Sequence, residues 1–290
     1  MQKFLIQFIT MVGKKAIRAI GALKSILISL IGKQKFDIIV KHISHIPLCK
    51  PLFYLAYYLL SEGMIVQPKE NFIWLVRLFG GSKWFTPHLN DAIDHINVIW
   101  REGIYDRYKP RKGHVVIDAG AHIGIYTVKA SKKVGRKGII LAIEPHPVNF
   151  ECLKKNLKLN NCTNVIAVNA ALASTYGETT LSVDDHSVGH STTLKRSNRS
   201  LSVHTITLDQ LIEDVKLTNI DLIKADVEGA MLDFLKGAEK TLALSRPKIV
   251  AEVGHYSTEK EEVIRFLADY DFIISTEGDI LYAETKRNSF

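Results

Sequence analysis

Three acidic side chains stand where short apolar runs of this sequence end, and their positions suit a ligand that carries an amine and neighbouring hydroxyls. Asp118 follows "VVI", Glu144 follows "IILAI" and Asp226 follows "IDLIKA". Glu144 comes about twenty residues after a glycine turn, which is where an acid binds the two ribose hydroxyls of a nucleoside. Asp118, beside that turn, would repel a pyrophosphate and attract an ammonium group.

Parallel strands followed by helices are the elements that must position these acids. The β-branched run at 114–117 favours a buried strand, and Gly120 and Gly124 bracket a tight turn after it. A helix then runs to a stop before Gly135. Such a turn lets a ligand approach the backbone and points free helix N–H groups at it.

The next two strands complete the predicted ligand site. Residues 139–143 form the second strand, and Pro147 opens the helix after it. Residues 165–168 form the third, which ends at Asn169 and Ala170, where an adenine could rest. S-adenosylmethionine has an amino group, a ribose and an adenine but no phosphate, so it fits these residues better than a dinucleotide does.

Residues at the ends of a fourth and a fifth strand are predicted to act on the methyl acceptor. Asp226 and Glu228 follow the strand at 220–225, and His255 follows the strand at 248–253. A carboxylate or imidazole there could take the proton of a hydroxyl acceptor, so Asp226 and His255 are candidate bases, and Glu228 would bind substrate or orient the turn. The structural alternatives are an ion pair of Asp226 with Lys224, two residues earlier, and a hydrogen-bonded His255 without a catalytic role.

The polar segment between the third and fourth strands predicts a loop or hairpin over the active site. Its His186, His190 and His204 match no compact set of metal ligands, so no metal site is predicted. Basic residues of the same segment could meet an acidic or phosphorylated acceptor; they are Lys195, Arg196 and Arg199.

Composition and charge set the frame for these motifs. The chain has 290 residues, 47% of them hydrophobic, which allows one large α/β domain with an extension. Seven lysines and arginines within residues 1–35 leave +1 of the net charge of +8 to the rest, which argues against a nucleic-acid partner. Three cysteines without a paired spacing favour a reducing compartment, the cytoplasm.

The basic residues of 1–35 fall on one half of a helical wheel and apolar residues on the other. Such a basic amphipathic helix could lie on the inner face of a membrane, and the alternative is that it packs on protein. Residues 36–110 are predicted to form a mostly helical cap region, because "PLFYLAYYLL" and "NFIWLVRLFGG" each carry an apolar face ended by breakers.

Four segments together resemble the FkbM-type methyltransferases of the class I S-adenosylmethionine-dependent fold, over about residues 112–275; they are "VVIDAGAHIGIYT", "IEPHPVNFECLKKNLKLN", "TLDQLI" and "IDLIKADVEGAMLDFLKGA". The resemblance implies a seven-stranded, mostly parallel sheet with helices on both faces in a methyltransferase domain over 111–290. The α-helical N-terminal extension lies outside the resemblance and is predicted from the sequence pattern alone. Met231 stands where the family usually has an acid, so we predict no role for that helix position.

From these patterns and the resemblance, the residues predicted to bind the cofactor are Asp118, Gly120, Ala121, His122, Gly124, Glu144, Pro145, Asn169 and Ala170. Those predicted to act in catalysis are Asp226, Glu228 and His255. The expected reaction is O-methylation of a hydroxyl on a sugar, glycan or lipid-linked acceptor. One alternative is a nicotinamide-dependent oxidoreductase, which would want a third glycine where Tyr126 stands. The other is a membrane-tethered binding protein without activity.

Overall fold

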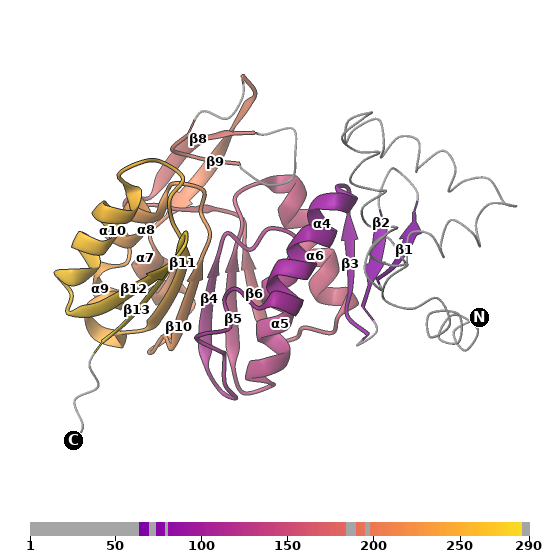
Figure 1. Cartoon of the computed structure of the whole chain (residues 1–290), viewed down its shortest axis with the longest axis horizontal. Helices are drawn as coiled ribbons and strands as arrows, with labels where there is room; N and C mark the ends of the chain where they lie inside the picture. The colour runs from indigo at the N-terminus through magenta and orange to yellow at the C-terminus, as the bar shows by residue number, and fades with distance from the viewer. Residues whose placement is uncertain (1–63, 70–73, 79–80, 184–189, 195–197, 286–290) are drawn as a thin grey trace, which may run out of the picture. The chain divides into compact units, whose positions relative to one another are not determined.

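The computed structural model describes residues 64–69, 74–78, 81–183, 190–194 and 198–285 (Figure 1). The chain divides into two compact units, Met1–Leu89 and Asn90–Phe290. The predicted basic helix at 1–35 lies outside the described residues, as do His186, Lys195 and Arg196. Within the described part, no helix has both the length and the apolar character needed to span a membrane.

The described part of the first unit is an antiparallel sheet, so the prediction of helices is wrong for this segment. Its strands pair in the order in which they follow one another; they are β1 (Ile65–Pro68), β2 (Trp74–Arg77) and β3 (Lys83–Thr86). Between β2 and β3, the Leu78 N–H donates to the Ser82 carbonyl at 2.9 Å. Val76 pairs with Trp84, and both are buried, so the bulky residues fit a pleated face.

Helical structure opens the second unit. α4 (Leu89–Ile96) continues into a π-helical segment, η2 (Asn97–Glu102), which ends at Gly103 in the left-handed region at φ 70°. The chain then passes Tyr105 and enters the main sheet. A helical interpretation therefore holds for this portion of the predicted cap region.

The main sheet has seven strands in the order β12-β13-β11-β10-β4-β5-β6 (Figure 1). Its five parallel strands are β4 (Val115–Ala119), β5 (Ile139–Ile143), β6 (Val165–Val168), β10 (Leu222–Ala225) and β11 (Lys248–Glu252). The antiparallel pair comprises β12 (Phe272–Glu277) and β13 (Ile280–Thr285). This is the predicted fold class, a class I methyltransferase sheet, and its strands lie within a few residues of the predicted runs.

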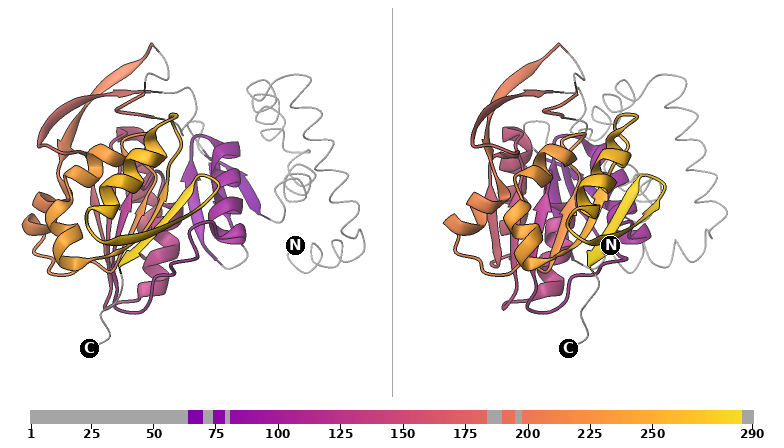
Figure 2. Two further views of the ribbon diagram at one scale, coloured as in Figure 1. Left: turned by 60° about the vertical axis from the view of Figure 1, so that its left-hand side comes forward. Right: turned by 90° about the vertical axis from the view of Figure 1, so that its left-hand side faces the viewer.

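Helices cover both faces of the sheet (Figures 1 and 2). One face carries α5 (Ile125–Val134) and α6 (Pro147–Leu159), which begin and end where the glycines and Pro147 predict. The other carries α7 (Leu208–Asp214), α8 (Met231–Lys236), α9 (Glu239–Ser245) and α10 (Glu259–Ala268). Ile117, Leu141 and Phe234 are fully buried in the core beneath this second layer, and Met231 lies in the same core.

A small second sheet follows β6 directly. It contains β7 (Ala171–Leu172), β8 (Gly177–Ser182) and β9 (Ser200–Ile206), with β8 and β9 antiparallel. Figure 2 shows the β8–β9 hairpin standing beyond the end of the main sheet. A hairpin between the third and fourth parallel strands was one of the two forms that the sequence predicts for this segment.

Candidate active site

The turn after β4 brings the carboxyl ends of β4, β5 and β10 together. The Gly120 and Ala121 N–H groups donate to the Ile143 carbonyl at 3.0 and 2.9 Å. Gly120 has φ 72°, and a Cβ on it would lie 1.8 Å from the Asp226 carbonyl oxygen. Only glycine permits this approach, so the turn and the end of β10 are one packed unit.

Glu144 is held just after β5 by two backbone donors. Its Oε2 accepts from the His122 N–H at 2.8 Å and its Oε1 from the His146 N–H at 2.9 Å. Burial raises the pKa of Glu144 to about 7, against the lowering effect of these hydrogen bonds. The carboxylate is therefore fixed in place and still able to accept further hydrogen bonds.

Asp118 contacts Lys224, which corrects the predicted pairing of Lys224 with Asp226. Asp118 is fully buried, with Oδ1 3.3 Å from Lys224 Nζ and with Oδ2 accepting from Thr127 Oγ1 at 2.5 Å. The reason is register: β4 and β10 are neighbours, and Lys224 pairs directly with Asp118 across them. Burial opposes the charge of Lys224, but the carboxylates of Asp118 and Asp226 raise its pKa.

A cavity joins the glycine turn to the end of β10 and encloses about 710 Å³, including the space at its open mouth. Five of the predicted cofactor residues line it; they are Gly120, His122, Glu144, Pro145 and Ala170. Asp226 and Glu228 line the same cavity from its other side.

The other predicted cofactor residues do not line the cavity but hold or underlie the segments that do. Asn169 Nδ2 donates to the carbonyls of Glu144 and Pro145 at 2.8 and 3.0 Å, and so holds the turn after β5. Gly124 begins α5 with φ 87°. Asp118 and Ala121 are buried under the turn, at 0 and 4% exposure.

Three histidines line the cavity, namely His95, His122 and His190, and His146 packs against the last of them; the sequence singled out His122 and His190. The rings of His95 and His122 lie 5.2 Å apart, and those of His146 and His190 lie 4.1 Å apart. Burial lowers the pKa of His95 and holds that of His122 well below its usual value. These two imidazoles are therefore neutral near pH 7, and the cavity receives no positive charge from them.

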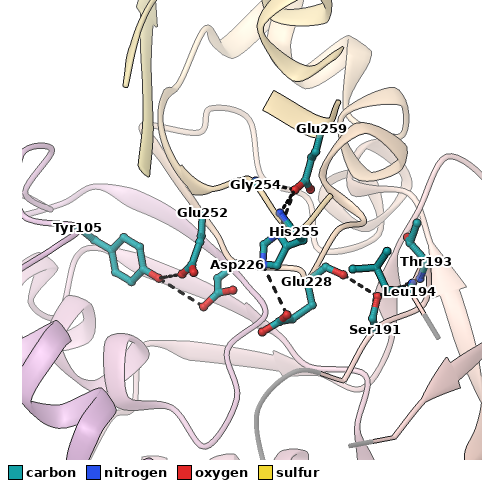
Figure 3. Close-up of polar contacts among 10 residues, drawn as sticks. All are labelled: Tyr105, Ser191, Thr193, Leu194, Asp226, Glu228, Glu252, Gly254, His255 and Glu259. Carbon is teal, nitrogen blue, oxygen red and sulfur yellow. Dashed lines mark hydrogen bonds and ion pairs between the residues drawn. The ribbon is translucent and has the colours of Figure 1, made fainter. Parts of the chain in front are cut away.

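The surroundings of Asp226 and Glu228, in contrast, are acidic (Figure 3). The carboxylates of Asp226 and Glu252 flank Tyr105, whose Oη lies 3.3 Å from Asp226 Oδ2 and 3.5 Å from Glu252 Oε2. Burial, together with the charge of Asp226, raises the pKa of Glu252 to about 7. Sequence reasoning missed Tyr105 and gave Glu252 no role, because no motif connects residue 105 with the end of a strand more than a hundred positions later.

His255 is fixed between two glutamates (Figure 3). Its Nδ1 lies 3.0 Å from Glu259 Oε2, which also accepts from the Gly254 and His255 N–H groups at 2.8 Å. Its Nε2 lies 3.5 Å from Glu228 Oε2. Burial opposes the charge of His255, but the Glu259 hydrogen bond and Glu228 raise its pKa. Glu259 was also missed, although it follows His255 by four residues at the start of α10.

The three predicted catalytic residues come together. Ligand atoms of Asp226, Glu228 and His255 all lie within 4.8 Å of one another. The hairpin histidines behave differently: His190 lines the cavity, whereas His204 lies exposed on β9, 3.6 Å from Glu178. Arg199 is exposed beside the same strand.

Comparison with known proteins places the chain among methyltransferases. The family profile described as "Methyltransferase FkbM domain" matches residues 118–274. The methyltransferase sdnD of Sordaria araneosa is 26% identical over 211 residues, which cover 62% of this chain and 81% of that protein. The hexuronic acid methyltransferase AglP of Haloferax volcanii is 30% identical over 205 residues, covering 70% of this chain and 74% of that protein.

Among solved structures, the methyltransferase FkbM of Methylobacillus flagellatus is similar with a TM-score of 0.46 and 20% identity. The similarity covers 60% of this chain and 43% of that one, so this chain spans less than half of the solved protein.

Proposed function

The chain belongs to the FkbM family of S-adenosylmethionine-dependent methyltransferases, and we propose that it methylates a hydroxyl group of a sugar. Family membership confirms the predicted enzyme class and cofactor. The relatives described above are methyltransferases, so the oxidoreductase alternative has no support from them.

The observation that carries the proposal is the single cavity with Glu144 at one side and Asp226 and Glu228 at the other. S-adenosylmethionine supplies an electrophilic methyl group on a sulfonium, and loses that positive charge when the group leaves. We propose that Glu144 accepts the ribose hydroxyls and that Gly120, His122, Pro145 and Ala170 contact the remainder of the cofactor. Asp118, Ala121, Gly124 and Asn169 then position those residues rather than touch the cofactor.

A hydroxyl acceptor must lose its proton as the new carbon–oxygen bond forms and the carbon–sulfur bond breaks. Asp226 lines the cavity and is our first candidate to accept that proton. His255 is the second candidate, because Glu259 orients its ring and would stabilise the imidazolium. Glu228 faces both the cavity and His255, so it can bind the acceptor.

Two observations support a sugar as the acceptor. Asp226, Glu228 and Glu252 are acceptors of hydrogen bonds gathered at one place, and a sugar offers several hydroxyl donors to such a group. The relative AglP is named a hexuronic acid methyltransferase. An apolar acceptor would offer these carboxylates no hydrogen-bond donor and would displace water from them, at a desolvation cost.

The test is methyl transfer from isotopically labelled S-adenosylmethionine to a panel of neutral sugars and hexuronic acids, free and lipid-linked. We expect a methyl ether, which survives mild alkali. A methyl ester, which alkali removes, would contradict the hydroxyl assignment, since an ionised carboxylate needs no base. Asp226→Asn should abolish most of the transfer, and the exposed carboxylate of α8 provides the control Asp233→Asn.

A further inference from the structure

We propose that Asp226, Glu228 and His255 form a binding site for one divalent metal ion of the Mn²⁺ or Zn²⁺ type. The existence of this site does not depend on the proposed function. Its role in positioning a sugar acceptor does rest on that function, and the experiment below separates the two.

The three side chains lie close enough together to be brought onto one metal ion (Figure 3). The candidate ligand atoms lie within 4.8 Å of one another, and His255 Nε2 is 3.5 Å from Glu228 Oε2. Metal–ligand bonds of about 2.1 Å place adjacent ligand atoms about 3 to 4 Å apart. One imidazole with two carboxylates is a mixed nitrogen and oxygen set, which favours Mn²⁺, Fe²⁺ or Zn²⁺ over Mg²⁺ and Ca²⁺.

The surroundings of His255 provide an independent observation. Metal-binding histidines usually donate their second ring N–H to a carboxylate, which fixes the tautomer and leaves the other nitrogen to the metal. Glu259 occupies that position at 3.0 Å from Nδ1, and its side chain is fully buried. Its Oε2 also accepts from two backbone N–H groups, which prevent it from turning away. Nε2 is thereby directed to Glu228 and to the acidic side of the cavity.

The carboxylate of Asp226 and the main chain of Glu228 are also held from outside the set. Asp226 Oδ2 accepts from Tyr105 Oη at 3.3 Å, which orients that carboxylate. The Glu228 carbonyl accepts from Ser191 Oγ at 2.6 Å, and Ser191 Oγ accepts in turn from the Leu194 N–H at 2.8 Å. Each proposed ligand therefore belongs to a residue with its own support, as metal sites require.

Charge balance favours a cation at this place. Asp226, Glu228 and Glu252 gather around it. The buried ammonium of Lys224 also interacts with Asp226, but its direct contacts are with Asp118 and with the Gly120 carbonyl, to which it donates at 3.0 Å. A divalent ion with three protein ligands keeps open positions. Two neighbouring oxygens of a sugar, or a sugar carboxylate, could occupy them, and a hydroxyl so bound is more acidic.

The experiment titrates the full-length protein, stripped with a chelator and desalted, with Mn²⁺, and follows the electron paramagnetic resonance signal of free Mn²⁺. We expect one saturable site. Glu228→Gln and His255→Ala should weaken it by ~100-fold or more, and Glu259→Gln by about 10- to 100-fold, the usual cost of losing an outer carboxylate. The matched control is His204→Ala, because His204 also pairs with a glutamate, at 3.6 Å, but on the exposed hairpin.

Calorimetric binding of S-adenosylmethionine by each variant checks that it is folded. The proposal is overturned if no saturable site appears up to millimolar Mn²⁺, or if His255→Ala binds Mn²⁺ as well as the parent does. Sugar methylation that proceeds unchanged with a chelator would reject the metal's role and leave the proposed function standing. Triad-dependent Mn²⁺ binding without methylation of any sugar would reject the function and leave the site standing.

Discussion

We predict that Glu144 makes the affinity for S-adenosylmethionine depend on pH. Its side chain is 6% exposed, and burial raises its pKa to about 7 from an ordinary 4.5. Ribose hydroxyls donate hydrogen bonds, so they favour the ionised carboxylate. Below pH 7, Glu144 must therefore lose its proton when the cofactor binds. The dissociation constant of the cofactor should rise by up to about tenfold for each unit by which the pH falls below 7.

The pKa shift of Glu144 also sets the size of its effect on the free energy of unfolding. A change from 4.5 to about 7 corresponds to about 3 kcal/mol, which is the net cost of keeping the charge buried. Because the folded pKa lies above that of the unfolded chain, the folded state binds more protons between those two pH values. The contribution of Glu144 to stability therefore falls as pH rises through that window, and the cofactor-free protein loses up to about 3 kcal/mol.

Calorimetry of cofactor binding between about pH 5.5 and 8 measures this linkage, with buffers of different ionisation enthalpy to count the released protons. Glu144→Gln should bind about 10- to 100-fold more weakly, because a charged acceptor is lost. Its affinity should also lack the step near pH 7. The cofactor's own amine titrates equally in both proteins, so their difference isolates Glu144. Glu151→Gln, on the exposed side of α6, is the control.

Equal affinities of Glu144→Gln and parent would refute the ribose assignment. If the affinity of the parent protein for the cofactor stays constant across this pH range, the claim that Glu144 has a raised pKa is refuted.

The remaining predictions concern the strand ends and the N-terminal segment. Asp226→Asn should keep the melting temperature and lower methyl transfer by about 10²- to 10⁴-fold, whereas an early-melting variant with parental turnover would remove Asp226 as the base. Lys224→Met leaves a buried carboxylate without its cation, and urea unfolding should show a loss of ~3 to 5 kcal/mol. Gly120→Ala should destabilise the protein and lose cofactor affinity, because its Cβ would meet a carbonyl at 1.8 Å; Gly113→Ala, also at positive φ but in open space, controls for strain alone. Deletion of residues 1–35 should abolish sedimentation with anionic vesicles but keep cofactor binding, and an aggregated product would instead assign that segment to the core.

The parallel strands could be predicted because each is a short apolar run that an acid or amide ends. Ile139–Ile143 and Val165–Val168 were predicted to the residue, and the helix after β5 begins at Pro147 as expected. Local signals of this kind need no knowledge of distant contacts. The candidate site could then be predicted from the order of the strands along the chain, because ligands bind at the carboxyl ends of parallel strands.

Pairing across the sheet could not be predicted from local spacing. Lys224 lies two residues before Asp226, which suggested an ion pair along one strand, but the register puts Asp118 beside it. The prediction of a helix around Trp74 was wrong for a different reason. A short apolar run fits a helix face or a buried strand equally well, and only the Val76–Trp84 pairing decides between them.

The outer supports of the site differ in how far the sequence could reveal them. Glu259 lies four residues after His255, at the start of a helix, so a search for carboxylates around each candidate histidine would have found it. Tyr105 comes before every strand of the main sheet in the sequence, and only the folded chain brings it into contact with Asp226. A position of that kind becomes visible only once the strand order is known.

The acidic side of the cavity has a consequence for rate. Catalysis requires contacts that are stronger in the transition state than in the reactants. A methyl sulfonium loses its positive charge as the methyl group transfers, so the carboxylates of Asp226, Glu228 and Glu252 would stabilise the charged cofactor more than the transition state. A proton that moves from the acceptor onto Asp226, or a cation bound by the triad, removes that imbalance at the same place. In the proposed reaction, the position of the carboxylates therefore makes acceptor deprotonation and charge neutralisation part of the same step, and this coupling favours a hydroxyl acceptor.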